Sequence, residues 1–114
     1  CMSSAAGAGI KAFGIDRGMP FPLEDIASAE AILLVGSNAA ETMPPVMQYF
    51  DEQKRSGGKL IVVDPRVTKT AEEADLHLQL TPGSDIALAL GMLHIATRER
   101  LLDYGFIAAR TGGY

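Results

Sequence analysis

The sequence predicts an α/β fold, a three-layer parallel sheet of about three strands with helices on both faces. Residues 31–36 form a continuous apolar run, residues 59–64 have an apolar centre, and both segments have the length of strands that are buried on both faces. A third run, residues 76–80, alternates in polarity, which indicates a more exposed strand. Helix-like segments separate the three runs, and this alternation is typical of a parallel sheet with right-handed crossovers.

The expected elements follow the order helix, strand, helix, strand, helix, strand, helix. Ser3 or Ser4 can cap the first helix. Pro44 and Pro45 suit the first turn of a later helix, where a missing N–H costs little. The other residues that interrupt regular structure, chiefly glycine and proline, predict where the helices and strands end. The expected helices cover residues 3–13, 23–29, 46–55, 68–74, 86–98 and 101–109, and residues 14–22 and 37–45 are expected to be loops.

The composition and net charge argue against several classes of function. A formal net charge of -4 and the absence of a basic cluster argue against nucleic-acid or anionic-membrane binding, because nothing would compensate phosphates. The single cysteine, Cys1, excludes an internal disulfide and a zinc or iron–sulfur site built from this chain's thiolates alone. No apolar run approaches the roughly 20 residues that a membrane span needs.

Polar residues follow each predicted strand. Ligands of open parallel sheets bind beyond the carboxyl ends of the strands, so these loops are the candidate site. The candidates are Gly36, Ser37, Asn38 and Glu41 after the first strand, Asp64, Pro65 and Arg66 after the second, and Thr81, Pro82, Gly83, Ser84 and Asp85 after the third. Together they predict a nucleotide site.

Each loop suits one part of a nucleotide. Gly36 would let the backbone approach a phosphate, with the positive end of the next helix nearby. Asp64, at the end of the second strand, is placed to accept ribose hydroxyl groups. Asp85 could accept two charge-assisted hydrogen bonds from the amide edge of guanine.

Structural alternatives stand beside these roles. Asp85 equally suits a helix cap, and Asp64 with Pro65 suits a strand-ending turn. Ser37 with Asn38 suits a turn, Glu41 suits a solvated first helical turn, and Arg66 suits a pair with a nearby carboxylate. The G-x-G-x-x-G signature of dinucleotide-binding folds is absent after the first strand. His77 and His94 have no partner at ligand spacing, which favours structural roles, and Met2, Met43 and Met47 suit core filling better than a pocket.

The motifs resemble those of the bacterial molybdopterin oxidoreductases. This dimethyl-sulfoxide-reductase superfamily includes nitrate reductases and formate dehydrogenases. The resemblance covers essentially the whole chain and rests on C-M-S-S-A, LLVGSNAAET, LIVVDPRVTKTAEEADLHLQLTPGSDIALALGMLH and FIAART-G. It implies that residues 1–114 form a single Rossmann-like α/β domain, a fragment of the molybdopterin guanine dinucleotide-binding region of a larger enzyme.

The resemblance also implies roles for particular residues. The Cys1 thiolate would ligate molybdenum, Met2 would lie beside the metal, and the cofactor would be molybdenum bis-molybdopterin guanine dinucleotide. One dinucleotide would be bound by Gly36, Ser37, Asn38, Glu41, Asp64, Pro65, Arg66, Gly83 and Asp85. An iron–sulfur cluster is expected in an amino-terminal domain outside this chain.

Within the family, Cys1-Met2 and the segment AETMPPVMQYF look most like assimilatory nitrate reductases. Formate dehydrogenases usually have His after the metal-ligating residue, and Met2 departs from that pattern. The implied reaction is the reduction of nitrate to nitrite in the cytoplasm, with an electron-donor protein or cofactor and the remaining domains as partners. The alternatives are the same domain of a formate dehydrogenase, a stand-alone nucleotide-binding or regulatory module, and a domain that only supports its neighbours.

A start at Cys1 leads us to expect a chain cut from a larger protein. We expect the 114 residues alone to bind no molybdenum and to be inactive. Small residues between positions 3 and 14 form a surface that could cause dimerisation as an artefact of truncation.

Overall fold

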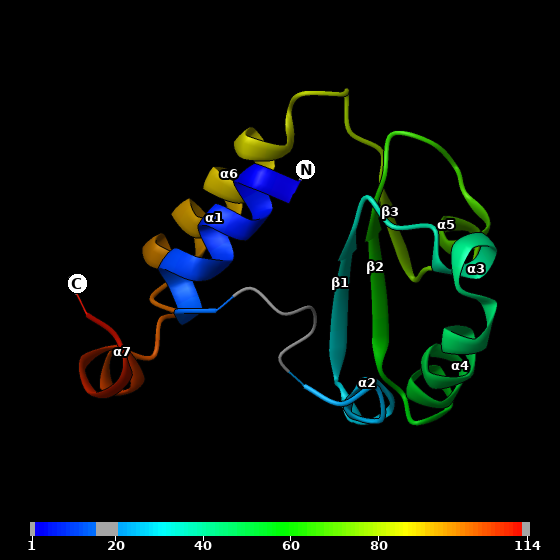
Figure 1. Ribbon diagram of the computed structural model, residues 1–114, viewed down its shortest axis with the longest axis horizontal. Helices are drawn as coiled ribbons and strands as arrows, with labels where there is room; N and C mark the ends of the chain where they lie inside the picture. Colours follow the sequence, from blue (N-terminus) through cyan, green and yellow to red (C-terminus); the bar gives the residue numbers. More distant parts are fainter. Residues whose placement is uncertain (1, 16–20, 113–114) are drawn as a thin grey trace.

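The computed structural model describes residues 2–15 and 21–112 (Figure 1). The observed elements agree closely with the expected ones. They are α1 (Met2–Phe13), α2 (Asp25–Ser28), β1 (Ala31–Val35), α3 (Ala39–Thr42), the 3-10 turn η1 (Pro44–Val46), α4 (Met47–Arg55), β2 (Lys59–Val63), α5 (Lys69–Glu72), β3 (Leu76–Leu78), α6 (Asp85–Arg98) and α7 (Tyr104–Arg110). No described helix has the length and apolar character of a membrane span.

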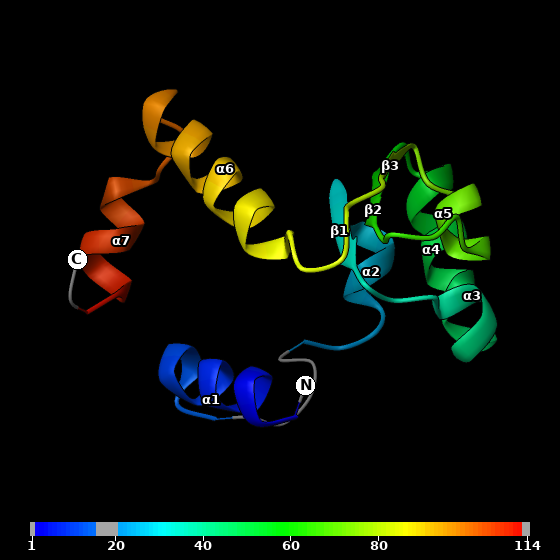
Figure 2. The same cartoon turned by 90° about the horizontal axis from the view of Figure 1, so that it is seen from above.

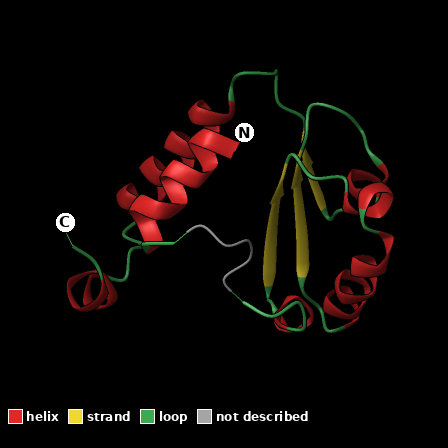
Figure 3. Ribbon diagram, in the orientation of Figure 1, coloured by secondary structure: helices red, strands yellow, loops and turns green. Residues whose placement is uncertain are grey.

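The three strands form one parallel sheet, as the sequence predicts, and their order in the sheet is β1-β2-β3 (Figure 3). The register pairs Leu33 with Ile61, and Ile61 in turn with Leu76. β2 is therefore the central strand, hydrogen-bonded on both sides, while β1 and β3 each leave one edge free within the described residues. Its sequence, Lys-Leu-Ile-Val-Val, is almost wholly apolar, as expected for the central strand of a parallel sheet, and three of its five side chains are buried.

The core lies between this sheet and the helices that connect its strands. Leu60 and Val62 point from β2 toward Phe50 of α4, and the Val62 side chain is fully buried. Ala39 of α3 and Ala71 of α5 complete the buried cluster, which lets both short helices approach the sheet closely. Partly buried side chains extend the cluster at its rim: Ile26, Ile32, Leu34, Val46, Met47 and Ala74.

Helices lie on both sides of the sheet, but only those of one side pack against it. α3, α4 and α5 cover one face, whereas α1 and α6 stand away from the other (Figures 1 and 2). Leu33 and Val35, on that second face, are consequently 43% and 52% exposed. The apolar side chains of α6, Ile86, Leu90, Leu93 and Ile95, are exposed as well.

The segment expected as a loop after β1 is more ordered than the sequence indicates. It contains α3 and then η1, with Pro44 and Pro45 opening the 3-10 turn and not the first turn of α4 itself. The hydroxyl of Thr70 accepts a hydrogen bond from the Ala40 N–H at 3.0 Å. A partner this distant in sequence satisfies an N–H group that a four-residue helix leaves unpaired, and local patterns cannot reveal it.

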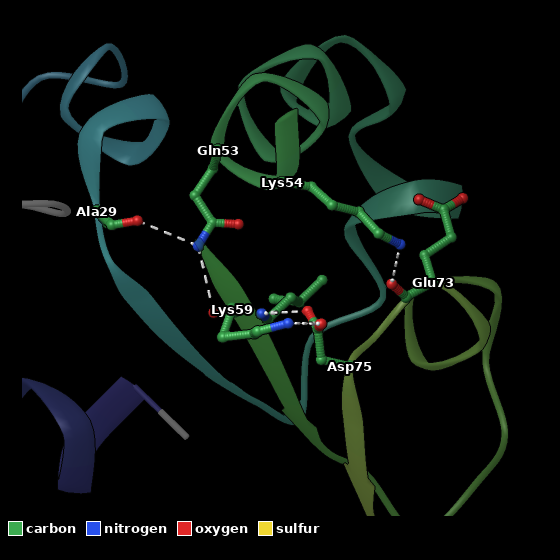
Figure 4. Close-up of polar contacts among 7 residues, drawn as sticks. Ala29, Gln53, Lys54, Lys59, Glu73 and Asp75 are labelled. Carbon is green, nitrogen blue, oxygen red and sulfur yellow. Dashed lines mark hydrogen bonds and ion pairs between the residues drawn. The ribbon is translucent and has the colours of Figure 1, made fainter. Parts of the chain in front are cut away.

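The amino ends of β1 and β2 are held together by Gln53 (Figure 4). Its side-chain nitrogen donates to the carbonyls of Ala29 at 3.1 Å and Lys59 at 3.2 Å, and Gln53 itself is fully buried. Gly58 leaves room for this carboxamide. A Cβ there would lie 2.6 Å from Gln53 Cδ and 2.7 Å from the Ala29 carbonyl oxygen. One side chain of α4 therefore joins both strands.

A second contact at the same end joins β2 to the residue before β3. Lys59 Nζ pairs with Asp75 Oδ1 at 2.8 Å, and Asp75 Oδ2 accepts from the Leu60 N–H at 3.0 Å (Figure 4). The hydrogen bond from Lys59, then that from Leu60, lowers the pKa of Asp75 below its usual value.

We predict that Gly58→Ala lowers the free energy of unfolding by about 1–3 kcal/mol, since the added methyl group must displace the Gln53 carboxamide or the Ala29 backbone. Urea denaturation followed by circular dichroism measures the change. Gly91→Ala is the matched control, because a Cβ there meets nothing within 4 Å and α6 should gain helix propensity. Equal stabilities of the two variants would contradict the proposed crowding at Gly58.

The lowered pKa of Asp75 makes a pH-dependent contribution to stability. A depressed carboxyl pKa stabilises the fold above the unfolded value, about 4 for aspartate, and the contribution is lost as pH falls through the folded pKa. We therefore expect Asp75→Asn to destabilise the chain at pH 7, and the difference from wild type to shrink toward pH 3. Urea titrations across this range measure it, with Asp51→Asn on the exposed surface of α4 as control. A difference independent of pH would contradict the role of the ionised carboxylate.

Candidate functional site

The predicted site residues of the first two loops lie beyond the carboxyl ends of β1 and β2. Gly36 directly follows β1 and has φ of +61°, a conformation that favours glycine. A Cβ at Gly36 would meet nothing within 4 Å, so the backbone is open there. The Gly36 N–H itself donates to the Val63 carbonyl at 2.8 Å and extends the sheet by one bond. Ser37, the next residue, is half-buried.

Asn38 and Glu41 contact each other and are fixed by α5. Asn38 Nδ2 donates to Glu41 Oε2 at 2.5 Å, while Asn38 Oδ1 accepts from the Thr70 hydroxyl at 3.0 Å. Lys69 Nζ lies 3.7 Å from Glu41 Oε1. The Thr70 hydroxyl also accepts from the Ala40 N–H, so this one buried group joins the loops after β1 and β2. The carboxamide of Asn38 is therefore occupied within the protein.

The second loop forms the turn that its Asp-Pro sequence allows. Asp64 is only 6% exposed, and its Oδ1 accepts from the Arg66 N–H at 2.8 Å. His77 Nε2 lies 2.9 Å from the Asp64 carbonyl oxygen, which confirms the structural role expected for this histidine. Gln79 donates to the Pro65 carbonyl at 2.8 Å and ties the third loop to the second. Asp64 thus holds the turn in which the exposed Arg66 lies.

Arg66 itself has no ion pair among residues 2–15 and 21–112. The expected alternative, a pair with a nearby carboxylate, is therefore not observed. Arg66 is exposed in the loop after β2, where its guanidinium could meet an anion.

The third loop leaves the same edge of the sheet but then turns toward α6 (Figure 1). Gly83 has φ of +88° and open space around it. Ser84 is the N-cap residue of α6, and its hydroxyl donates to the Thr81 carbonyl at 2.6 Å. Asp85 is the first residue of the helix and is exposed, so the capping position expected as its alternative role belongs to Ser84. The Asp85 carboxylate remains accessible from solvent.

Cys1 and Met2, the two residues expected at the metal, stand where the described part of the chain begins. Cys1 lies outside the described residues, and Met2 contributes the first residue of α1. Where the structure is described, no cluster of three or more histidine, cysteine, aspartate or glutamate side chains could hold a metal ion. His94 is exposed on α6, and Met43 is half exposed, whereas Met47 packs against the core.

The strand-end loops offer an exposed cation at Arg66, open backbone at Gly36 and Gly83, and an accessible carboxylate at Asp85. Asp64 is less accessible, because its carboxylate is largely buried and one oxygen is already bonded. Asn38 and Glu41 shape the loop by contacting each other.

Sequence reasoning missed Thr70 as a member of this site. Thr68 and Thr70 both belong to the D-P-R-x-T-x-T-A motif, and Thr68 accepts from the Ala71 N–H as the N-cap of α5. Thr70 is fully buried, although threonine is mostly an exposed residue. The signal in the sequence was a polar side chain on the buried side of a short helix, beside the apolar Ala71 and Ala74.

The chain is similar to proteins of one known family. Residues 1–104 match the family described as molybdopterin oxidoreductase. The chain is 46% identical over its full 114 residues to the assimilatory nitrate reductase catalytic subunit of Bacillus subtilis, of which it covers 16%. It is 42% identical over 104 residues, 91% of its length, to the F420-dependent formate dehydrogenase 1 subunit alpha of Methanococcus maripaludis, of which it covers 15%.

A solved structure is also similar. Acetylene hydratase from Pelobacter acetylenicus superposes with a TM-score of 0.57 at 37% identity, over 70% of this chain and 11% of that one. The chain thus spans about a sixth or less of the length of these proteins.

We predict that Thr70→Val loosens the joined loops, because the near-isosteric side chain leaves the Ala40 N–H and the Asn38 carboxamide oxygen without their partner. Each unsatisfied buried group costs about 1–3 kcal/mol. We expect a lower free energy of unfolding and faster amide exchange at Ala40, measured by urea denaturation and NMR. Thr70→Ser, which keeps the hydroxyl, should retain the slow exchange. Equal exchange rates in the two variants would contradict the link.

Proposed function

This chain belongs to the molybdopterin oxidoreductase family, and from that premise we propose that it binds one molybdopterin guanine dinucleotide within a larger, molybdenum-dependent oxidoreductase. The observation that carries the proposal is the arrangement beyond the carboxyl ends of the strands. There the Thr70 hydroxyl joins the loops after β1 and β2, Arg66 has no ion pair within the described residues, and the exposed Asp85 begins α6 after the third loop.

Each residue would have a distinct part in binding. Arg66 would bind the pyrophosphate, with the backbone beside Gly36 and Ser37 approaching it closely. Asp85 would accept hydrogen bonds from the guanine edge, and Gly83 would leave room for the base. Asn38, Glu41, Asp64 and Pro65 would hold the loops in shape.

Cys1 would ligate the molybdenum of the bound cofactor through its thiolate, with Met2 beside the metal. A thiolate suits this role because it is a soft ligand. When bound, the cofactor supplies the two electrons that reduce the substrate. The iron–sulfur cluster that delivers electrons would belong to an amino-terminal domain, and the second dinucleotide would be bound by a further domain. The 114 residues alone should therefore hold no molybdenum.

Nitrate is the substrate that we propose for the whole protein, with nitrite as product in the cytoplasm. The support is the 46% identity to an assimilatory nitrate reductase subunit and Met2 at the position after the cysteine. The 42% identity to a formate dehydrogenase subunit supports formate as the second candidate. Nitrate reduction and formate oxidation by the full-length protein, assayed side by side, decide between them.

NMR titration of the ¹⁵N-labelled chain with GDP tests the binding proposal. We expect shifts at residues 36–41, at Arg66 and at Asp85. Asp85→Asn should weaken binding by roughly 10- to 100-fold, because hydrogen bonds to a charged group contribute about 1.5–3 kcal/mol.

Asp51→Asn serves as the control for this titration, since Asp51 is exposed on α4 and belongs to none of the three loops. It should leave the GDP affinity unchanged. Shifts confined to other surfaces, or an affinity that Asp85→Asn does not alter, would contradict the proposed site.

A further inference from the structure

β1 lies at an edge of the sheet, but its amino-acid composition is that of a strand paired on both sides. β1 is Ala-Ile-Leu-Leu-Val, with no charge, proline or glycine to discourage pairing. The opposite edge of the sheet differs, because β3 is three residues long and carries the polar His77 at its centre. Natural sheets protect true edges by shortness and polarity, and only the β3 edge has that protection.

Two backbone hydrogen bonds at the ends of β1 show which of its backbone groups point to the free edge. The Glu30 carbonyl accepts from the Lys59 N–H at 2.9 Å, and the Gly36 N–H donates to the Val63 carbonyl at 2.8 Å. Backbone groups alternate in direction along a strand, so the even-numbered residues of β1 face β2. The N–H and C=O groups of Ala31, Leu33 and Val35 therefore point to the free edge.

An apolar cavity of about 720 Å³ lies along β1. Ala31, Ile32, Leu33 and Leu34 line it from the strand, Phe21 and Leu23 from the segment before α2, Met43 from the segment after α3, and Phe50 from α4. Phe21 and Met43 are 47% and 50% exposed. An added strand would cover these apolar side chains and supply partners for the unpaired backbone groups at once.

The position of α6 indicates which part of the polypeptide could supply this added strand. The chain passes from β1 to β2 to β3 in one direction, with α3, α4 and α5 on one face. α6 lies on the opposite side of the sheet and descends toward the level at which the strands begin (Figures 1 and 2). A right-handed crossover on the opposite face returns the chain toward β1 and past it, as in doubly wound sheets.

We propose that the free edge of β1 binds a parallel strand of the same polypeptide, supplied by a segment outside these 114 residues. The chain covers 16% of the length of a relative that matches it throughout, so relatives of this length have ample sequence to supply one. The strand order then reverses beside β1, and the loop of Gly36 and Ser37 lies at that reversal. This inference does not depend on the identity of the bound cofactor.

Hydrogen exchange of the full-length protein and of the 114-residue chain tests the inference. The amides of Leu33 and Val35 should exchange at least about tenfold more slowly in the full-length protein, which is the effect of one ordinary hydrogen bond. Ile32 and Leu34, already bonded toward β2, provide the internal reference. Equal exchange of Leu33 and Val35 in the two proteins would overturn the proposal.

A pair of variants separates the backbone from the side chain. Leu33→Pro and Leu33→Ala both remove the leucine side chain, but only proline removes the outward N–H. In the full-length protein Leu33→Pro should lower Tm more than Leu33→Ala does, by a margin larger than in the 114-residue chain. Equal margins would overturn the proposal. So would a dimer of the 114-residue chain that Leu33→Pro dissociates and Leu33→Ala does not, because the edge would then bind a second copy.

Discussion

The structure depends on the burial of its central strand. β2 is hydrogen-bonded to a neighbour on each side, and Val62 and Val63 are almost completely buried on its opposite faces. Phe50, Ala39 and Ala71 pack against one face only, so α3, α4 and α5 take their positions from that strand. Because the buried cluster is small, side-chain hydrogen bonds at the two ends of the sheet contribute much of what defines the arrangement.

The two ends of the sheet are built differently. At the amino ends, Gln53 and Asp75 bond directly to backbone groups of the strands and the residues beside them. At the carboxyl ends, Thr70 bonds between two loops and leaves the backbone at Gly36 open and Arg66 accessible. The carboxyl ends therefore expose polar groups where a ligand of a parallel sheet would bind.

The second face of the sheet gives the chain its large exposed apolar surface. Leu33 and Val35 face away from the core, and Ile86 and Leu90 of α6 are likewise exposed. Surfaces of this kind mark contacts with other protein. A chain that covers about a sixth or less of its relatives' length has this property naturally, since such contacts in a longer polypeptide would be made by segments beyond it.

The sequence by itself determined the three strands, their parallel order and most helix boundaries, because apolar runs and breaker residues act locally. It also determined the strand-end position of the candidate residues, since every parallel strand ends at the same edge. Only the tertiary structure decided which of them are occupied: Asn38 and Asp64 bond within the protein, while Arg66 and Asp85 stay accessible. The role of Thr70 depends on contacts across about thirty positions of the chain, and such contacts leave no periodic signal in a sequence.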